Sequence, residues 1–237
     1  MFFSLVLPAY NEANALPKAV EAARAELLKI KGLRFEIIIA EDGSRDETPE
    51  VAKRLSRRFK DVRLLHSDER LGRGRALNRA FRSARGDVVA FMDVDLATAP
   101  KHLRELVRYS RDFDVVIGSR YLASSKAERS LSRRFLSWWF NFLVRALLGS
   151  RVRDHQCGFK AFRKVALLKI LPRVRARHWF WDAEVLVIAQ RSGLSVKEFP
   201  VEWVEKGRGG KTKVNLKRDV LDMFFGILEL RWRLWFG

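Results

Sequence analysis

The stretch Val88-Val89-Ala90-Phe91-Met92-Asp93-Val94-Asp95 decides the fold, because it joins an apolar run to two carboxylates one residue apart. Alternate side chains of an extended chain share a face, so we expect Asp93 and Asp95 to point the same way beyond the sheet edge. Two hard oxygen ligands on one side suit Mg²⁺ or Mn²⁺, particularly when substrate phosphates supply further ligands. The alternative is that Asp95 only caps the next helix, since N-caps of this kind are common.

Apolar runs on both sides of this stretch alternate with segments of helical spacing. The runs expected to form strands are residues 3–8, 35–40, 62–65, 88–92 and 115–117. In the second half of the chain, we expect a polar and flexible segment over residues 124–132, a strand that runs through Phe162 after residues 154–159, a helix over residues 182–189 and a single strand over residues 196–204. Helical spacing covers residues 16–28, 48–59 and 74–84, and Pro100 opens a further helix. This alternation with short connections predicts an α/β fold, in which helices sandwich a mostly parallel, Rossmann-like central sheet.

Three of the expected strands end in polar residues. These ends are residues 10–12, 41–44 and 93–95. Ligands of such sheets bind beyond the carboxyl ends of the strands, and one topology brings the three segments together there. Their convergence favours a metal site at Asp93 and Asp95 over a simple helix cap.

A glycine-containing segment, Leu71-Gly72-Arg73-Gly74-Arg75, precedes one of the expected helices. It lacks the Lys-Ser/Thr of a nucleoside-triphosphatase loop, and Leu77 stands where a dinucleotide fingerprint requires its third glycine. We therefore predict a tight turn before a helix, with Arg73 or Arg75 as a candidate to contact a donor phosphate.

Charge is the unusual feature of the composition. The 237 residues are 48% hydrophobic, which suffices for one large α/β domain or two small ones, and carry a net charge of +19. Residues 1–100 hold 18 basic and 15 acidic residues, a net of +3, which leaves +16 for residues 101–237. The excess predicts an anionic partner: nucleic acid, anionic lipid or a phosphorylated substrate.

Cysteine and histidine indicate no metal or disulfide chemistry. A single Cys157 excludes an internal disulfide framework and a cysteine-based metal site. The four histidines have no ligand spacing, so we assign them no metal. The first residues lead into an apolar run without a basic n-region, so no signal peptide is expected.

Two aromatic segments lie in the basic half. Residues 135–148 combine Trp and Phe with Asn141 and Arg145, and residues 220–236 repeat that character. Both are shorter than the roughly 20 apolar residues of a membrane span. Helices rich in Trp and Phe with flanking Arg suit the membrane interface, although a buried core helix is the alternative.

The carboxylate pair and the positive charge of the chain together indicate the type of substrate. Two carboxylates holding a divalent cation in a basic protein suggest a nucleotide diphosphate, whose departure the metal would assist as a Lewis acid. The sequence shows no Ser-His-Asp or Cys-His arrangement and no obvious pair of catalytic carboxylates. An acceptor phosphate monoester, with a second pKa of about 6, would need no base. Arg133 and Ser137, one helical turn apart, could grip such a phosphate.

Five ordered motifs carry a resemblance to a known family. They are Pro8-Ala9-Tyr10-Asn11-Glu12, Glu41-Asp42-Gly43-Ser44, Asp93-Val94-Asp95, Gly118-Ser119-Arg120 and Asp154-His155-Gln156-Cys157-Gly158-Phe159. From about residue 2 to about residue 215 the chain resembles family 2 inverting glycosyltransferases, and within them the dolichyl-phosphate mannose and glucose synthases. The resemblance implies a GT-A fold and transfer of a hexose from a nucleotide sugar to a polyprenyl phosphate, with inversion.

The resemblance also implies roles for individual residues. Those that would hold the nucleotide sugar are Pro8, Tyr10, Glu12, Asp42, Asp93, Arg208 and Lys213. Asp93 and Asp95 would bind Mg²⁺ or Mn²⁺, and Arg120, Arg133 and Ser137 would grip the acceptor phosphate. The residues expected to be catalytic are Asp95, Arg120 and Arg133.

Two departures from the pattern of the family bear on the identity of the sugar donor. Glu41 replaces the usual first Asp of its pair, and Ala97-Thr98 stands where mannose synthases often carry a Gln ligand. This favours UDP-glucose, with a GDP-mannose-dependent synthase as the alternative. Two rivals are a family 2 enzyme with a soluble or protein acceptor and a basic nucleic-acid-binding module, although we expect no nucleic acid partner.

We predict a GT-A domain over residues 1–214, with an interfacial helix at about 133–149, followed by a C-terminal amphipathic membrane-surface helix over residues 215–237. Such a protein would be peripheral, without a transmembrane span, on the cytoplasmic face of the cell membrane, where anionic lipid would attract its positive charge.

Overall fold

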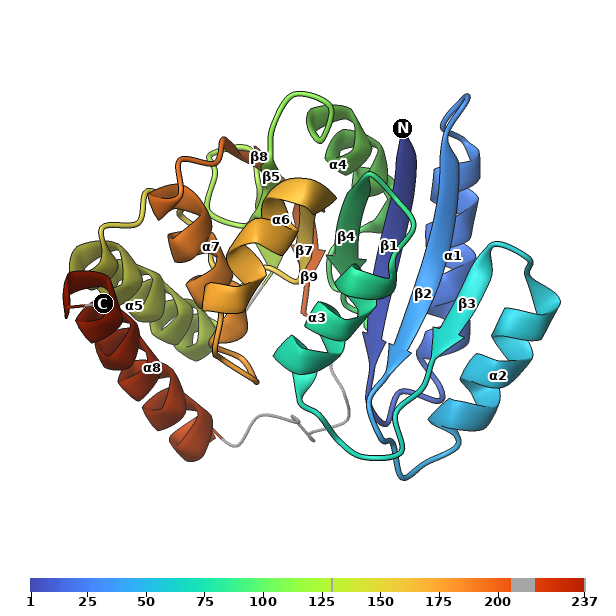
Figure 1. Ribbon diagram of the computed structural model, residues 1–237, viewed down its shortest axis with the longest axis horizontal. Coiled ribbons are helices and arrows are strands. Elements are labelled where there is room, and N and C mark those ends of the chain that lie inside the picture. The colour runs from blue at the N-terminus through green and yellow to red at the C-terminus, as the bar shows by residue number, and fades with distance from the viewer. Residues whose placement is uncertain (129, 206–215, 237) are drawn as a thin grey trace.

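The computed structural model describes residues 1–128, 130–205 and 216–236, except for the side chains of residues 132, 133 and 216–220. A seven-stranded sheet with the order β3-β2-β1-β4-β7-β5-β8 forms its centre (Figure 1). The strands are β1 (Phe2–Ala9), β2 (Arg34–Glu41), β3 (Val62–Leu65), β4 (Val88–Met92), β5 (Val115–Ser119), β7 (Phe159–Arg163) and β8 (Val196–Pro200). This confirms the predicted α/β fold with a mostly parallel sheet.

The first half of the sheet forms as its sequence pattern predicts. β1 pairs in parallel with β2 on one side and with β4 on the other. All five residues of β4 are buried, which explains its continuous apolar run. Because the three strands are adjacent and parallel, their carboxyl ends lie at one edge of the sheet.

The second half departs from the parallel pattern at β7, which lies antiparallel between β4 and β5. β7 places a lysine, Lys160, in the fully buried core of the sheet. The sequence predicts a strand here but not its direction. β7 brings the segment just before it, residues 154–158, to the same edge as the end of β4, since Met92 pairs with Phe159.

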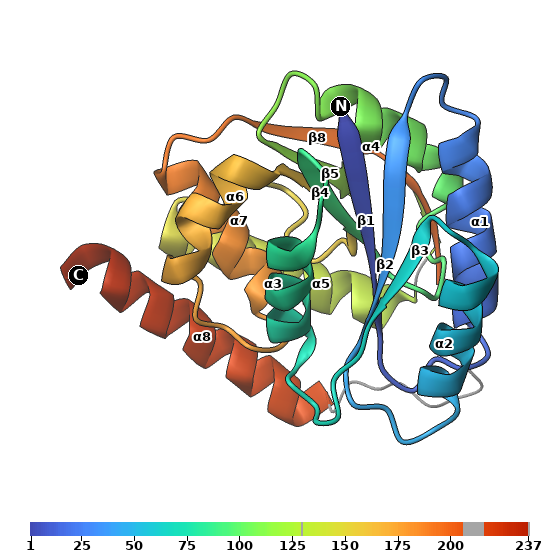
Figure 2. The same cartoon turned by 45° about the vertical axis from the view of Figure 1, so that its right-hand side comes forward.

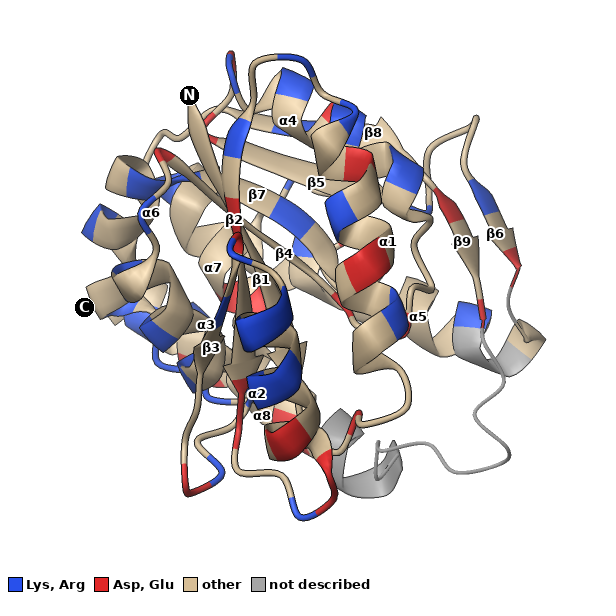
Figure 3. Cartoon of the chain, turned by 90° about the vertical axis from the view of Figure 1, so that its right-hand side faces the viewer, with Lys and Arg blue, Asp and Glu red and all other residues tan. Residues whose placement is uncertain are grey.

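Helices cover both faces of the sheet, as Figures 1 and 2 show. The helices are α1 (Leu16–Leu28), α2 (Thr48–Arg58), α3 (Arg73–Ser83), α4 (Leu103–Tyr109), α5 (Leu131–Leu148), α6 (Lys164–Ile170), α7 (Trp181–Arg191) and α8 (Leu216–Phe236), with 3₁₀ turns η1 (Pro100–His102) and η2 (Leu171–Arg173). The apolar faces of α1, α2 and α4 pack in one core cluster, and those of α3, α5, α6, α7 and α8 pack in the other. Lys and Arg occur on most of the helices, α2 and α4 among them (Figure 3).

The structure corrects two expectations from the sequence and contains one helix that the sequence does not predict. Residues 196–204, expected as one strand, form β8 and a separate β9 (Glu202–Val204), because the chain leaves the main sheet after Pro200. Residues 124–132, expected to be polar and flexible, contain β6 (Lys126–Glu128), which pairs in parallel with β9. The sequence reading also missed α6, whose seven residues are too few to show a clear helical period.

α5 and α8 are in contact on the side of the molecule away from β3 (Figure 1). Each buries a few residues, including Val144 of α5 and Ile227 of α8, and the Arg231 side chain donates from Nη1 to Leu147 O at 2.9 Å. Their other faces expose large apolar residues: Leu131, Phe135, Leu136, Trp138, Trp139 and Phe142 on α5, and Leu221, Phe224, Phe225, Leu228, Trp232, Trp235 and Phe236 on α8. We call these residues the aromatic surface.

The two aromatic segments are thus helices that are part core and part exposed surface. Among the described residues, no helix combines the length and the apolar character needed to cross a membrane. The predicted domain boundary between residues 214 and 215 lies outside the described residues.

Candidate functional site

The loops after β1 and β2 are joined by hydrogen bonds at the edge where the strands end. Asn11 N–H donates to Ser44 Oγ at 2.9 Å, and Arg45 N–H donates to Asn11 Oδ1 at 2.8 Å. Glu12 N–H donates to Thr48 Oγ1 at the start of α2. Asn11 has a φ of 51°, a left-handed conformation that Asn tolerates better than most residues. Pro8, Tyr10 and Glu12 are therefore held at this edge by a fixed turn.

Asp42 joins the same edge to the glycine-containing segment. Its Oδ1 accepts from Leu71 N at 2.7 Å and its Oδ2 from Gly72 N at 3.1 Å. Burial raises the pKa of Asp42 above its ordinary value, against the effect of these two bonds. Gly72 has a φ of 92° and precedes α3, which is the tight turn that the sequence predicts. Both oxygens of Asp42 thus position the start of α3, a role that the sequence alone does not reveal.

Asp93 lies at the end of β4 and is held by two neighbours, Gly158 and Arg73. Its backbone N–H donates to Gly158 O at 3.0 Å, and the Gly158 Cα lies directly against the carboxylate. Oδ1 accepts from Arg73 Nη2 at 2.8 Å, yet the Asp93 side chain remains 41% exposed. Desolvation raises the pKa of Asp93 above its ordinary value, and the Arg73 guanidinium opposes that shift.

Asp95 does not cap a helix. Its Oδ1 accepts from Ala97 N at 3.0 Å, closing a local turn, and the next helical segment, η1, begins after Ala99 without a side-chain cap. The helix-cap alternative is therefore wrong. Leu96, within this turn, has a φ of 55°, an uncommon conformation for a leucine.

Asp93 and Asp95 offer hard oxygen ligands of the kind that Mg²⁺ and Mn²⁺ prefer. Within the described part of the chain, no group of three or more His, Cys, Asp or Glu residues could hold a metal ion. The pair therefore fits a divalent cation whose other ligands come from water and from a bound molecule, as a diphosphate would supply. A metal site at Asp93 and Asp95 stays a prediction from the sequence.

A buried ion network behind Asp93 was missed by the sequence reading. Arg73 donates from Nη1 to Asp182 Oδ2 and from Nη2 to Asp93. Asp182, at the start of α7, also accepts from Lys160 Nζ at 2.6 Å, and Lys160 is fully buried. The Arg73 guanidinium lies 5.0 Å from the centroid of the Phe91 ring and 5.6 Å from that of Trp179. In the sequence, Arg73 is a candidate to contact a donor phosphate, and Asp182 is an acid that follows the aromatic run 179–181. Neither feature indicates that the two residues form an ion pair.

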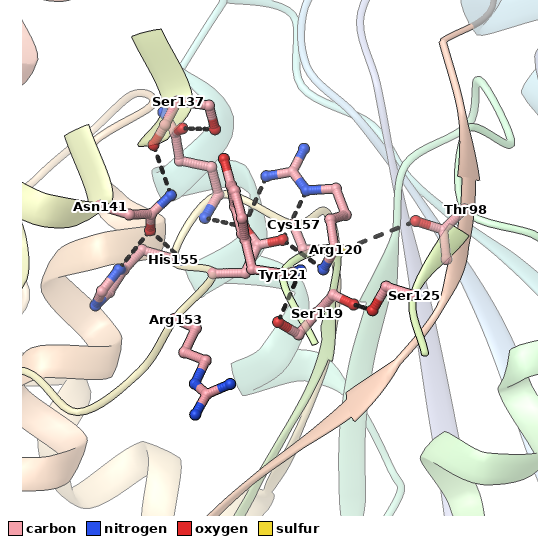
Figure 4. Close-up of polar contacts among 12 residues, drawn as sticks. Thr98, Ser119, Arg120, Tyr121, Ser125, Ser137, Asn141, Arg153, His155 and Cys157 are labelled. Carbon is pink, nitrogen blue, oxygen red and sulfur yellow. Dashed lines mark hydrogen bonds and ion pairs between the residues drawn. The ribbon is translucent and has the colours of Figure 1, made fainter. Parts of the chain in front are cut away.

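Arg120 and Ser137, two of the three predicted acceptor residues, lie beside the segment before β7 (Figure 4). Arg120 donates from Nε and Nη2 to the two oxygens of Asp154, each at 2.7 Å, and its side chain is only 9% exposed. Ser137 Oγ donates to Gln156 Oε1 at 3.0 Å, which places α5 next to the same segment. The structure thus brings Arg120 and Ser137 to neighbouring positions of one segment, Asp154 and Gln156.

Three predicted site residues cannot be located. The Arg133 side chain, Arg208 and Lys213 lie outside the described residues.

The residues between these groups have structural roles. His155 is fully buried, with Nδ1 2.7 Å from Asn141 Oδ1, and burial lowers its pKa to about 3. Burial raises the pKa of the Cys157 thiol to about 11, so it is protonated and unreactive at neutral pH. Neither is arranged as a nucleophile or a general base, in keeping with the absence of such a pattern in the sequence.

Comparisons with known proteins found a matching family model and several relatives. The family model described as Glycosyl transferase family 2 matches residues 4–171. Glycosyltransferase AglD of Haloferax volcanii is 48% identical over 98% of this chain, although the chain spans 37% of that protein's length. Dolichyl-phosphate beta-glucosyltransferase ALG5A of Trichomonas vaginalis is 34% identical, over 91% of this chain and 69% of that protein. The human dolichyl-phosphate beta-glucosyltransferase is 31% identical, over 98% and 77%.

A solved structure shares the fold. Glucosyl-3-phosphoglycerate synthase from Mycobacterium tuberculosis, in complex with uridine diphosphate, superposes with a TM-score of 0.74 at 21% identity, covering 97% of this chain and 80% of that one. At this identity the likeness shows the fold alone, and it confirms the predicted GT-A fold.

Proposed function

This chain belongs to glycosyl transferase family 2, and from that premise we propose that it transfers glucose from UDP-glucose to a polyprenyl phosphate such as dolichyl phosphate, with inversion. The sugar and the acceptor are proposed from the names of two relatives of which this chain covers more than two thirds, the Trichomonas vaginalis and human proteins, since each is called a dolichyl-phosphate beta-glucosyltransferase. The strand-end geometry supports the donor half of the proposal independently of those names.

On the donor side, the edge formed by β1, β2 and β4 would receive the nucleotide. Tyr10 and Glu12 stand on the turn after β1, and Asp42 fixes the loop that faces them. Asp93 and Asp95 would hold Mg²⁺ or Mn²⁺, which when bound supplies positive charge to the departing diphosphate. These residues would thereby orient the donor so that its anomeric carbon faces the segment 154–158.

On the acceptor side, no general base is needed. A phosphate monoester is largely dianionic at pH 7, so its oxygen can attack the anomeric carbon directly as the bond to the nucleotide diphosphate breaks on the opposite side. Arg120, Arg133 and Ser137 would position that phosphate. Asp154 holds the Arg120 side chain in one orientation through two oxygens, so little freedom would be lost when a ligand binds.

The aromatic surface would bring the protein to its lipid substrate. Trp138 on α5 and Trp232 on α8 are 50% and 62% exposed, and both helices carry arginines. Trp and Phe with flanking Arg are typical of the membrane interface. We therefore propose peripheral attachment to an anionic membrane, on its cytoplasmic face, where nucleotide sugars are available.

A donor screen tests the enzymatic proposal. UDP-glucose, UDP-galactose and GDP-mannose are offered with a short polyprenyl phosphate and Mn²⁺, and the glycolipid product is measured. UDP-glucose should give the highest kcat/KM by at least about tenfold. Higher turnover with GDP-mannose would establish the mannosyl alternative instead, and transfer only to a soluble acceptor would reject the lipid proposal.

Liposome sedimentation tests the membrane proposal. The variant Trp138→Ser/Trp232→Ser should bind vesicles containing anionic lipid less tightly than the wild type. Leu28→Ser is the matched control, because Leu28 is an apolar residue of α1 that is 57% exposed but lies outside the aromatic surface. Equal loss of binding in both variants would contradict a specific role for that surface.

A further inference from the structure

Arg73 stands where the donor site meets the core. Its guanidinium uses one nitrogen for Asp93, a proposed metal ligand, and another for Asp182, while its side chain is only 13% exposed. The Phe91 and Trp179 rings lie 5.0 and 5.6 Å from it, which further confines its position. Arg73 is therefore a fixed cation next to the predicted metal ligands, held from its inner side by a second carboxylate.

The charges around Arg73 determine how strongly the site attracts a metal. Arg73 and Lys160 form ion pairs with Asp93 and Asp182, and the Asp95 carboxylate acts on Asp93 as a further nearby negative charge, so these three carboxylates and two cations carry a net charge of −1. Lys160 is buried and bound to Asp182, which leaves Arg73 as the cation that neutralises Asp93. A divalent ion approaching Asp93 without other ligands would meet this guanidinium at close range, where repulsion is strong because solvent screening is reduced.

We propose that Arg73 is a built-in counter-cation that prevents tight metal binding at Asp93 and Asp95 until a nucleotide diphosphate adds its own negative charge. The inference rests on the proposed function, since it assumes that the two carboxylates form the metal site. Arg73 acts through Asp93 and is a positioning residue. This role of Arg73 also couples the two ligands, so that bound nucleotide strengthens metal binding and bound metal strengthens nucleotide binding by the same factor.

Replacement of Arg73 by a neutral residue should strengthen Mn²⁺ binding. Arg73→Gln should bind free Mn²⁺ at least about tenfold more tightly than the wild type, because the group then carries a charge of −2. If Arg73 had only a structural role, its substitution would weaken the affinity for Mn²⁺ or leave it unchanged. Mn²⁺ binding is measured by electron paramagnetic resonance of the free ion, with and without UDP, so that no turnover is required.

Four further variants complete the experiment. Arg73→Lys keeps the charge and should stay within about threefold of the wild type. Arg82→Gln removes the same charge from an exposed position of the same helix and should have no effect. Arg73→Met repeats the neutralisation with a different side chain, in case the glutamine variant folds poorly by circular dichroism. Adding Asp95→Asn to Arg73→Gln should remove the gain.

The outcomes separate the inference from the proposed function. Mn²⁺ binding by Arg73→Gln and Arg73→Met that is no tighter than wild type overturns the counter-cation role. A gain that survives Asp95→Asn also overturns it, because the ion then lies elsewhere. UDP should strengthen Mn²⁺ binding more in the wild type than in Arg73→Gln, and equal strengthening contradicts the coupling. Failure of glucose transfer in the donor screen would reject the proposed function without altering these affinities.

Discussion

Gly158 lies directly against the carboxylate of Asp93, so closely that a methyl group on Gly158 would overlap both the carboxylate oxygens and the carboxyl carbon. The same glycine accepts the Asp93 backbone N–H at 3.0 Å. Gly158 therefore sets the position of the first predicted metal ligand, and a side chain there would displace either the carboxylate or the start of β7.

Gly158→Ala should lower kcat/KM by about 100-fold, because a displacement of about 1 Å at a reacting site has effects of that size. Gly193→Ala is the control: its added methyl group meets no atom within 4 Å, and its φ of 75° should cost about 1 kcal/mol of stability without affecting turnover. Comparable turnover in both variants, measured on folded protein, would show that the Gly158 contact is not required.

Removal of the metal or of its ligand should stop the reaction. EDTA should lower turnover to background, and Mn²⁺ should restore the wild type but not Asp95→Asn, which we expect to be at least about 100-fold slower. The amide oxygen of asparagine can still accept the Ala97 N–H at 3.0 Å, so the local turn should survive. Turnover of Asp95→Asn within about tenfold of wild type at saturating Mn²⁺ would remove Asp95 from the metal site.

The free energy of unfolding should decrease as the pH is lowered below 6.5, because the buried His155 resists protonation in the folded state. Burial lowers its pKa to about 3, whereas a histidine in the unfolded chain titrates at about 6.5. Above pH 6.5 the residue is neutral in both states, and its contribution to stability is fully present. Below that pH the unfolded chain takes up a proton that the folded chain does not, so stability decreases by up to about 1.4 kcal/mol per pH unit until about pH 3.

Urea unfolding between pH 6.5 and pH 5 avoids the range in which most carboxylates titrate. Burial also lowers the pKa of His102, so the contribution of His155 is the difference between the wild type and a variant that keeps His102. In His155→Gln the dependence of the unfolding free energy on pH should be shallower over that range. An unchanged slope in the variant would show that His155 is not the group that takes up the proton.

The sequence predicts those parts of the site that depend on strand ends. β1, β2 and β4 are mostly apolar runs whose polar ends follow directly, so the convergence of these ends near Asp93 could be deduced from the pattern alone. The direction of β7 could not, because a run of five residues in which Lys160 and Arg163 stand among apolar residues has no feature that distinguishes antiparallel from parallel pairing.

Ion pairs across the fold could not be deduced either. Arg73 and Asp182 are 109 residues apart, and Arg120 and Asp154 are 34 apart. In the sequence each is one of many charged residues, and only the packing of α3 against α7, and of the end of β5 against the segment before β7, selects the partners. Asp154, which holds the Arg120 side chain, could therefore not be identified as its partner before the structure was known.

Arg233 of α8 forms an ion pair with Glu184, whose side chain is 1% exposed. Glu184 also accepts from Arg175 N at 3.0 Å and Ala176 N at 2.6 Å, so it connects α8 to the loop before α7. Arg233→Ala would leave this carboxylate buried without its cation, and we expect the free energy of unfolding to fall by about 3 kcal/mol. In Arg233→Ala/Glu184→Gln much of that loss should be recovered, since the amide carries no charge.

Urea denaturation of the single and double variants measures the coupling between the two residues. Arg231→Ala is the matched control, because Arg231 lies two residues away on α8 and donates one hydrogen bond, to Leu147 O. It should cost only about 1 kcal/mol. If Arg233→Ala were no more destabilising than Arg231→Ala, the ion pair with Glu184 would not be what holds the end of α8 against the loop. A large loss specific to Arg233 would instead identify this pair as the link between the aromatic surface and the loop that carries Trp179 to the donor site.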